Sequence, residues 1–129
     1  MLSIEKVEAE LKGLGYSPFS IDTAQGRTAI INYRIPVGKH AGEKVLLGFS
    51  FQGKEGYPEY PPHWIHISPP YDDNLLGAKQ PYEHPDNKGV DRKWLAMSRP
   101  PKSLWDDSAT KHMKFYLESH IPRFCKYLK

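Results

Sequence analysis

Apolar residues in the first segment of the chain recur at helical spacing. They share one face of the expected helix and are Ile4, Val7, Leu11 and Leu14. Ser3 stands at the position of an N-cap, because its hydroxyl can accept a hydrogen bond from a free backbone N–H. Gly13 and Gly15 are typical of a helix end. The pattern therefore predicts a helix that starts near Ser3 and ends near Gly13.

The helical spacing then gives way to short runs rich in β-branched and aromatic residues, which favour strands. These runs are residues 19–22, 28–35, 45–51 and 63–67. Turn-forming stretches separate them, and the Gly-containing one at 53–56 ends the third run. Because consecutive strands usually lie beside one another in a sheet, we expect a four-stranded antiparallel meander.

No regular element is indicated between Ser68 and Pro101. Prolines and glycines interrupt this stretch repeatedly, and most of the 12 prolines of the chain gather between Tyr57 and Pro101. A structureless segment of this length inside a compact domain is usually functional, or it is the sign of a misassigned element. We expect a long irregular loop here.

The last segment returns to helical spacing. Its apolar positions are Met113, Leu117, Ile121, Phe124 and Leu128. Asp106, Asp107 or Ser108 can cap its start and complement the helix dipole. Pro122 should kink or break the helix near residues 119–121, because proline lacks a backbone donor and crowds the preceding turn. The predicted fold class is α+β, with a helix, the four-stranded meander, the irregular loop and C-terminal helices.

The composition suits one domain spanning residues 1–129, since 39% of the 129 residues are hydrophobic. The formal charge of +3 is mild and the chain has no long run of Lys and Arg, so a nucleic-acid partner is not indicated. The acidic start of the chain is unlike a signal peptide, and no apolar run approaches the length of a membrane span. We therefore expect a cytoplasmic protein with no membrane partner.

Cysteine and histidine positions bear on metal binding. The single cysteine, Cys125, excludes a disulfide within the chain and disfavours a Cys-based zinc site. His63 and His66 fall on opposite faces of their expected strand, and His112 and His120 are too far apart to share a metal ion. We predict that the protein holds no metal and no cofactor.

Several short motifs follow one another in a characteristic order. Tyr57-Pro58 and Pro61-Pro62 precede a strand, and His84-Pro85-Asp86, Gly89 and Trp105 come before the last helices. This series resembles the ubiquitin-conjugating enzymes, which have the UBC fold. It is most similar to their divergent prokaryotic members, in which a Trp-x-x-x-Ser-Arg stretch, here residues 94–99, precedes the later Trp.

The resemblance implies a UBC-like fold and a role in a bacterial pathway that conjugates a ubiquitin-like protein to its targets. It also implies two protein partners, namely the ubiquitin-like protein and an activating-type (adenylating) enzyme. The Tyr-Pro-x-x-Pro-Pro stretch is expected to form a rigid turn packed under the sheet. Trp94 and Trp105 are expected to anchor the core, whereas an exposed Trp would indicate a partner contact.

The chain departs from this family where the family keeps its nucleophile, because residues 90–104 contain no cysteine. Ser98 lies near the vacant position and could carry an acyl group as an oxyester if a base took its proton. The candidate catalytic residues are therefore Ser98 and His84, with Asp86 or Asp91 to orient the imidazole. The other interpretation of Ser98 is a cap for the turn that follows it.

Three functions stay open. The first is a ubiquitin-conjugating-enzyme-like transferase component that accepts or positions the modifier's C-terminus, with a serine oxyester as the covalent form. The second is a non-catalytic UBC-like or RWD-like protein-binding module, since RWD domains share the Tyr-Pro pattern and lack the cysteine. The third is an unrelated enzyme that uses the His-rich strand. Cys125 itself is interpreted as a small packed hydrophobe on the last helix.

Overall fold

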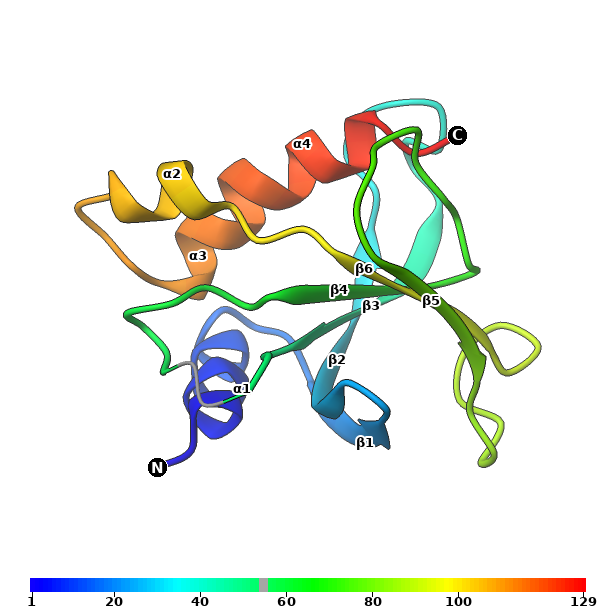
Figure 1. The fold of residues 1–129 in the computed structure, drawn as a ribbon, viewed down its shortest axis with the longest axis horizontal. Helices are drawn as coiled ribbons and strands as arrows, with labels where there is room; N and C mark the ends of the chain where they lie inside the picture. Colours follow the sequence, from blue (N-terminus) through cyan, green and yellow to red (C-terminus); the bar gives the residue numbers. More distant parts are fainter. Residues whose placement is uncertain (54–55) are drawn as a thin grey trace.

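The computed structural model describes residues 1–53 and 56–129, and its ribbon is drawn in Figure 1. The helices are α1 (Ser3–Gly13), α2 (Lys102–Asp106), α3 (Met113–Phe115), the π-helical turn η1 (Tyr116–His120) and α4 (Ile121–Lys126). The strands are β1 (Phe19–Thr23), β2 (Gly26–Arg34), β3 (Lys44–Ser50), β4 (Trp64–Ser68), β5 (Lys79–Glu83) and β6 (Lys93–Ser98). The expected turn at 53–56 includes residues 54–55, which lie outside the described part of the chain.

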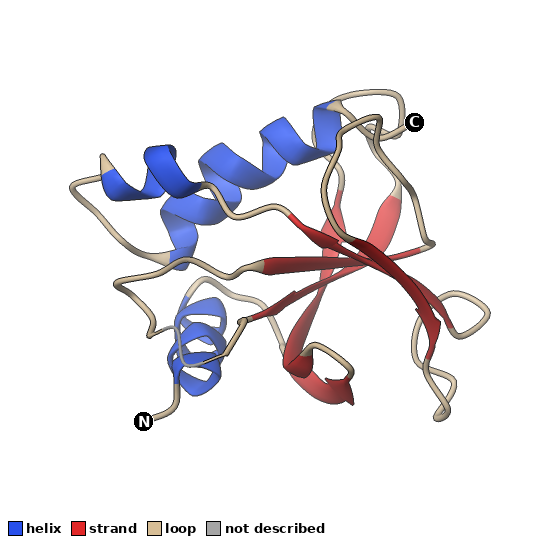
Figure 2. Cartoon of the chain, viewed as in Figure 1, coloured by secondary structure: helices blue, strands red, loops and turns tan. Residues whose placement is uncertain are grey.

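The strands form one antiparallel sheet in the order β1-β2-β3-β4-β6-β5, which curls into a half-barrel (Figure 2). The expected UBC-like fold, with a four-stranded meander and a long irregular loop, is therefore wrong. The segment expected to be irregular contributes two further strands, and β6 pairs with β4 from Trp64↔Ser98 to Ile67↔Leu95.

The local sequence of the β5–β6 hairpin did not predict strands, because its residues are typical of a loop. Pro81 lies in the middle of β5, and proline is tolerated there because β5 is an edge strand with one unpaired side. The connection contains His84-Pro85 and Gly89, which in isolation indicate a turn. Pairing with β4 supplies the stability that local propensity does not.

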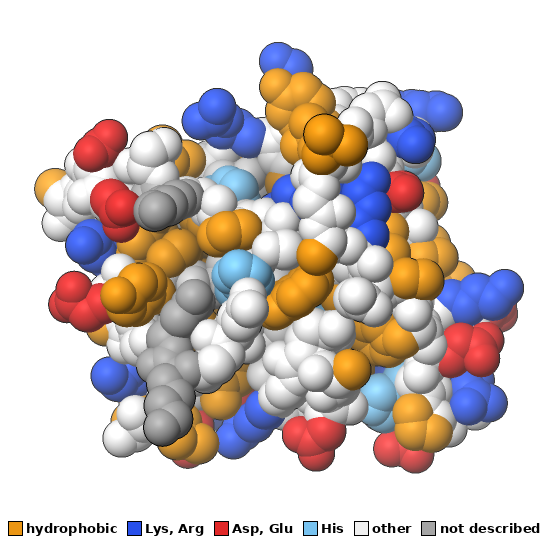
Figure 3. All heavy atoms as spheres, in the orientation of Figure 1, with side chains coloured by type: hydrophobic (Ala, Val, Ile, Leu, Met, Phe, Trp, Pro, Cys, Tyr) orange, Lys and Arg blue, Asp and Glu red, His pale blue; other side chains and the backbone are white. Residues whose placement is uncertain are grey.

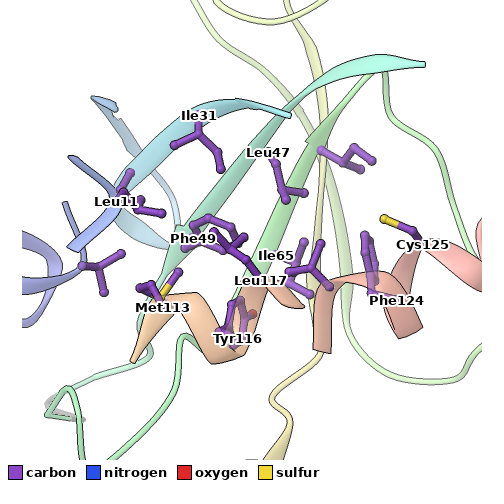
Figure 4. Close-up of a cluster of buried hydrophobic side chains, with 14 of the residues drawn as sticks. Leu11, Ile31, Leu47, Phe49, Ile65, Met113, Tyr116, Leu117, Phe124 and Cys125 are labelled. Carbon is purple, nitrogen blue, oxygen red and sulfur yellow. The ribbon is translucent and has the colours of Figure 1, made fainter. Parts of the chain in front are cut away.

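The main core lies between one face of the sheet and the helices α1, α3 and α4 with the intervening η1. All five apolar positions expected in the last segment are buried, which confirms that part of the prediction. Figure 4 shows residues of this cluster from both layers: Leu11, Ile31, Leu47, Phe49, Ile65, Met113, Tyr116, Leu117, Phe124 and Cys125. Trp105 is also buried in this core, as expected.

The other face of the sheet buries a second, smaller cluster because the sheet curls over itself. Trp94 packs there with Ile21 and Ile30, so it too is a core anchor as expected. Lys88 of the β5–β6 connection lies over the ring of Phe19 in β1, with 5.5 Å between Nζ and the ring centroid. The hairpin thus reaches the opposite edge of the sheet.

Two expected helix caps are wrong. At the start of α1, the Ser3 hydroxyl accepts a hydrogen bond from the Tyr57 N–H at 2.9 Å, and Glu5 Oε1 accepts from Leu2 N–H. Before α3, the capping side chain is His112, whose Nδ1 accepts from Lys114 N–H at 2.9 Å. The first cap could not be predicted from the sequence, because the Ser3 hydroxyl bonds to Tyr57, far along the chain. The second could not, because α3 begins only at Met113, after the turn at residues 107–112.

The expected kink at Pro122 takes the form of η1. The Ile121 N–H bonds to the Tyr116 carbonyl five residues back, so the helix widens by one residue just before the proline. A π-type turn relieves the crowding between a proline ring and the preceding carbonyls without ending the helix.

The Tyr-Pro-x-x-Pro-Pro stretch, expected to pack under the sheet, forms a turn that contacts α1 through Tyr57. The ring of Tyr57 is buried, its hydroxyl donates to Glu10, and the Trp105 indole N–H donates to the Pro58 carbonyl at 3.0 Å. Tyr60, in contrast, is exposed. Among the described residues, no helix is long and apolar enough to cross a membrane.

Candidate functional site

Ser98 is the last residue of β6. Its hydroxyl contacts His63, whereas the sequence motifs indicated His84 as the base. Ser98 Oγ is 2.7 Å from Nε2 of His63, and both side chains are half-buried. The Ser98 N–H donates to the Ala78 carbonyl at 3.0 Å, and the Arg99 N–H donates to the His63 carbonyl at 3.1 Å. A serine hydroxyl within hydrogen-bond reach of an imidazole is the arrangement of a nucleophile and its base.

His63 is held at the junction of three strands, immediately before β4. Its N–H donates to the Ser50 carbonyl at the end of β3 at 2.9 Å, and its carbonyl accepts from the residue after β6. Its ring lies beside that of Trp64, with 5.4 Å between the centroids. No carboxylate bonds to this imidazole in the described part of the chain, so the pair is a dyad without an orienting acid.

His84 lies at the opposite end of β6 from Ser98. It begins the β5–β6 connection, where its N–H donates to the Arg92 carbonyl at 2.9 Å and its Nδ1 accepts from the Asp86 N–H at 3.2 Å. The five residue steps of β6 correspond to roughly 16 Å of strand. The structure therefore does not bring Ser98 and His84 together. The carboxylates of Asp86 and Asp91 are exposed on this connection.

Gly89 completes the same connection. Its φ of +91° and the nearness of the Trp94 indole and Ser68 Oγ leave no room for a Cβ. Ser68 Oγ accepts from Val90 N–H at 2.5 Å and donates to the Lys93 carbonyl at 2.6 Å. In this chain the His-Pro and Gly motifs therefore build a hairpin, at a distance from the Ser98 hydroxyl.

A groove begins one residue beyond Ser98, between the chain that leaves β6 and the C-terminal helix. Its volume is about 250 Å³, and its lining residues are Leu75, Arg99, Pro100, Pro101, Ser103, Leu104, His120, Arg123, Phe124 and Tyr127. Leu75 and Tyr127 are 41% and 49% exposed, and Leu76 beside them is 97% exposed. Figure 3 shows hydrophobic and basic side chains together on this face, over α4 and the neighbouring chain.

His120 joins the two walls of the groove. Its Nε2 donates to the Arg99 carbonyl at 2.6 Å, which places the ring proton on that nitrogen. Burial lowers the pKa of His120 to about 4, and the nearby Arg123 acts in the same direction, whereas the bond to Arg99 opposes the shift. The imidazole is neutral at pH 7, and the exposed Arg123 is left as a cation at the groove.

Arg99 supports the groove through a buried ion pair with Asp73, which the sequence analysis did not predict. Its guanidinium bonds to Asp73, which is fully buried in the loop after β4. Desolvation alone would raise the pKa of Asp73, but the hydrogen bonds from Arg99 and Leu75 N–H and the charge of Arg99 lower it overall. The two residues are 26 positions apart, and no local signal in the sequence pairs them.

A second chain of buried polar groups crosses the other face of the sheet. His66 receives or donates hydrogen bonds at both ring nitrogens, with Ser50 Oγ at 2.8 Å and the Tyr82 hydroxyl at 2.7 Å. Burial lowers the pKa of His66 to about 3, so the ring is neutral. His63 and His66 thus have separate partners, as their spacing predicted.

Cys125 lies on α4 with its side chain in the main core, 1% exposed. Burial raises the pKa of the thiol to about 12, so it is protonated at neutral pH. The interpretation of this residue as a packed hydrophobe is confirmed. Within the described residues, no group of three or more His, Cys, Asp or Glu side chains is placed to hold a metal ion.

Comparison with family models, with curated proteins and with solved structures returned no match to this chain. The resemblance of its motifs to the ubiquitin-conjugating enzymes therefore bears on function only as a proposal.

Proposed function

We propose that this protein is a ubiquitin-conjugating-enzyme-like component of a bacterial conjugation pathway for a ubiquitin-like protein. It would receive the modifier from an activating-type, adenylating enzyme and position the modifier's C-terminal tail. The order of motifs from Tyr57 to Trp105 supports the pathway. A cytoplasmic location, without nucleic acid, membrane or cofactor, fits this role.

The observation that carries the proposal is the groove that starts one residue beyond Ser98. It is open and mostly apolar, and it places the exposed cation of Arg123 beside Leu75 and Tyr127. None of the described residues that line it is acidic. Such a surface suits an extended peptide that ends in a carboxylate, because apolar contacts supply affinity and the guanidinium attracts the terminal charge.

The covalent form of this function is an oxyester between the modifier's C-terminus and Ser98. A thioester on Cys125 is disfavoured, since the thiol is buried and its pKa is raised. An ester on Ser98 would hold the acyl group beside His63, one residue along the chain from Arg99 of the groove.

The test is intact mass spectrometry after incubation with a candidate bacterial ubiquitin-like protein and its adenylating enzyme, together with ATP. We expect an adduct that survives thiol reductant, is cleaved by hydroxylamine, and is absent in Ser98→Ala. Binding is measured in parallel by titrating a labelled peptide with the modifier's C-terminal sequence. Leu75→Glu with Tyr127→Glu should weaken this binding by at least tenfold. Wild-type protein that neither binds the peptide nor forms an adduct would refute the proposal.

The second candidate is a non-catalytic protein-binding module. The exposed side chains of Leu75, Leu76 and Tyr127 favour it, since neighbouring exposed apolar groups often mark a contact with another protein. This candidate predicts a stable complex with the modifier or the activating enzyme, and unchanged complex formation in Ser98→Ala. Absence of any covalent adduct alongside such a complex would select it.

A further inference from the structure

We propose that Ser98 and His63 form an acyl-accepting pair in which His63 is the base, and that the pair takes acyl groups from thioesters and other activated esters. The identity of the natural acyl group rests on the proposed function. The chemistry of the pair does not, because it can be tested with a small acyl donor.

The pair is built into the sheet and does not depend on a mobile segment. Ser98 is fixed by the pairing of β6 with β4, and His63 by backbone bonds to Ser50 and Arg99. The distance of 2.7 Å between Oγ and Nε2 is that of a formed hydrogen bond. For Ser98 to donate this bond, the ring proton of neutral His63 must be on Nδ1, which leaves Nε2 free to accept the serine proton.

The reaction that this geometry supports has two halves. In the first, Ser98 Oγ attacks the acyl carbonyl carbon while its proton moves to His63 Nε2, and the thiolate or aryloxide leaves with a proton returned from the imidazolium. In the second, an amine attacks the oxyester, His63 takes the amine proton, and Ser98 Oγ leaves as the hydroxyl after protonation. No oxidant, reductant or metal is needed in either half.

The backbone N–H groups of Ser98 and Arg99 are engaged in bonds to the neighbouring chain. The two nearest backbone N–H groups, those of Ser98 and Arg99, already bond to Ala78 and His63. They are therefore not available to stabilise an oxyanion, and loss of such a donor costs on the order of a hundredfold or more in rate. Missing donors slow acylation, hydrolysis and aminolysis alike, because each step passes through a tetrahedral oxyanion. An ester on Ser98 accumulates because a thiolate or aryloxide leaves the donor more readily than the serine alkoxide leaves the ester.

The experiment uses p-nitrophenyl acetate as the acyl donor, with release of nitrophenolate followed by absorbance and the acetylated residue located by peptide mapping. We expect one acetyl group on Ser98 that forms faster than it is lost. Ser98→Ala should abolish this adduct, and Ser17→Ala, at an exposed serine, should leave it unchanged. His63→Ala should slow acylation of Ser98 by roughly a hundredfold or more.

His63→Gln separates the chemical role of the imidazole from a structural one. Glutamine can still donate a hydrogen bond to Ser98 but cannot take its proton, so the variant should fold as the wild type does and acylate as slowly as His63→Ala. Circular dichroism and urea titration establish that each variant is folded.

Three results would overturn the inference. These are acetylation without modification of Ser98, an unchanged rate in folded His63→Gln, or loss of the reaction in His84→Ala instead of in the His63 variants. Acetylation of Ser98 by a protein that neither binds the modifier's C-terminal peptide nor forms an adduct with the ubiquitin-like protein would leave the pair standing and refute the pathway. Binding of the peptide in the groove without acetylation of Ser98 would support the pathway and refute the acyl-accepting pair.

Discussion

The guanidinium of Arg99 holds the carboxylate of Asp73 through two hydrogen bonds, from Nε to Oδ2 at 3.0 Å and from Nη2 to Oδ1 at 2.9 Å. Both side chains are buried, and the pair joins the loop after β4 to the residue that follows Ser98. The same guanidinium donates through Nη1 to the Ser98 carbonyl at 2.8 Å. One buried ion pair therefore sets the position of both the groove wall and the end of β6.

Asp73→Ala should lower the free energy of unfolding by about 3 kcal/mol or more, because it leaves the Arg99 charge buried without its partner. Asp72→Ala is the matched control, since its ion pair with Lys79 is partly exposed and such pairs contribute up to about 1 kcal/mol. Urea titration at pH 7 measures both variants. Similar losses in the two would show that the buried pair has no special role.

Gly77→Ala should destabilise the fold by about 1–3 kcal/mol. A Cβ at this position would lie 2.6 Å from Arg99 Nη1, and the φ of +129° is one that residues with side chains rarely adopt. Gly13→Ala, where a Cβ meets nothing within 4 Å, is the control and should change stability by no more than about 1 kcal/mol. In the Asp73→Ala background Arg99 is free to move, so the cost of Gly77→Ala should fall. An equal cost in both backgrounds would exclude the clash as its cause.

Tyr116→Phe should raise the free energy of unfolding by about 1 kcal/mol. Its hydroxyl is buried with no hydrogen-bond partner among the described residues, and burying an unpaired hydroxyl is unfavourable. Tyr57→Phe should instead lower stability by about 1–2 kcal/mol, because the Tyr57 hydroxyl donates to Glu10. Thermal and urea unfolding of the two variants would show opposite signs. A loss in Tyr116→Phe as large as that in Tyr57→Phe would contradict this assignment.

Stability should fall as the pH drops from about 6.5 towards 3, in part because of His66. Burial lowers the pKa of His66 from 6.5 to about 3, so in this window the unfolded chain binds a proton that the folded chain does not. Unfolding is then favoured by lower pH, and His120 contributes in the same direction between 6.5 and its pKa of about 4. In His66→Gln, urea titrations from pH 7 to 4 should show a slope smaller by about one proton. An unchanged slope would mean that His66 is accessible to protons in the folded state.

Cys125 should not react with a thiol reagent in the native protein. The side chain is buried and the pKa of the thiol is raised to about 12, so neither access nor the reactive thiolate is available. With Ellman's reagent at pH 8, we expect a reaction no faster than unfolding, and a single thiol released at once in denaturant. Rapid labelling of folded protein would reopen a role for this cysteine.

The helices could largely be predicted from the sequence, since helical periodicity is a local property. The spacing of Ile4, Val7 and Leu11 predicted α1, and the apolar positions of the last segment predicted the buried face of the C-terminal helices. Cys125, Trp94 and Trp105 were likewise assigned correctly to the interior. The sequence predicted where Pro122 distorts the helix. The form of the distortion, a π-helical turn, depends on packing of the helix against the sheet.

The β5–β6 hairpin could not be predicted in the same way. Its strands carry Pro81 and are separated by turn residues, so local propensity indicates a loop. They form a hairpin because β6 finds a partner in β4, more than two dozen positions earlier in the chain. The ion pair of Arg99 with Asp73 and the chain from Ser50 through His66 to Tyr82 depend on the same long-range pairing.

The amino-acid sequence by itself predicts that Ser98 lies near the position where the ubiquitin-conjugating enzymes, which its motifs resemble, keep a nucleophile, because that inference needs only the order of motifs. Which histidine lies beside it was decided by the tertiary structure. The register Trp64↔Ser98 places the serine beside the residue before β4, whereas His84 is carried to the far end of the strand. Strand register is set by burial over the whole sheet, so the partner of a single hydroxyl is fixed only when the sheet is complete.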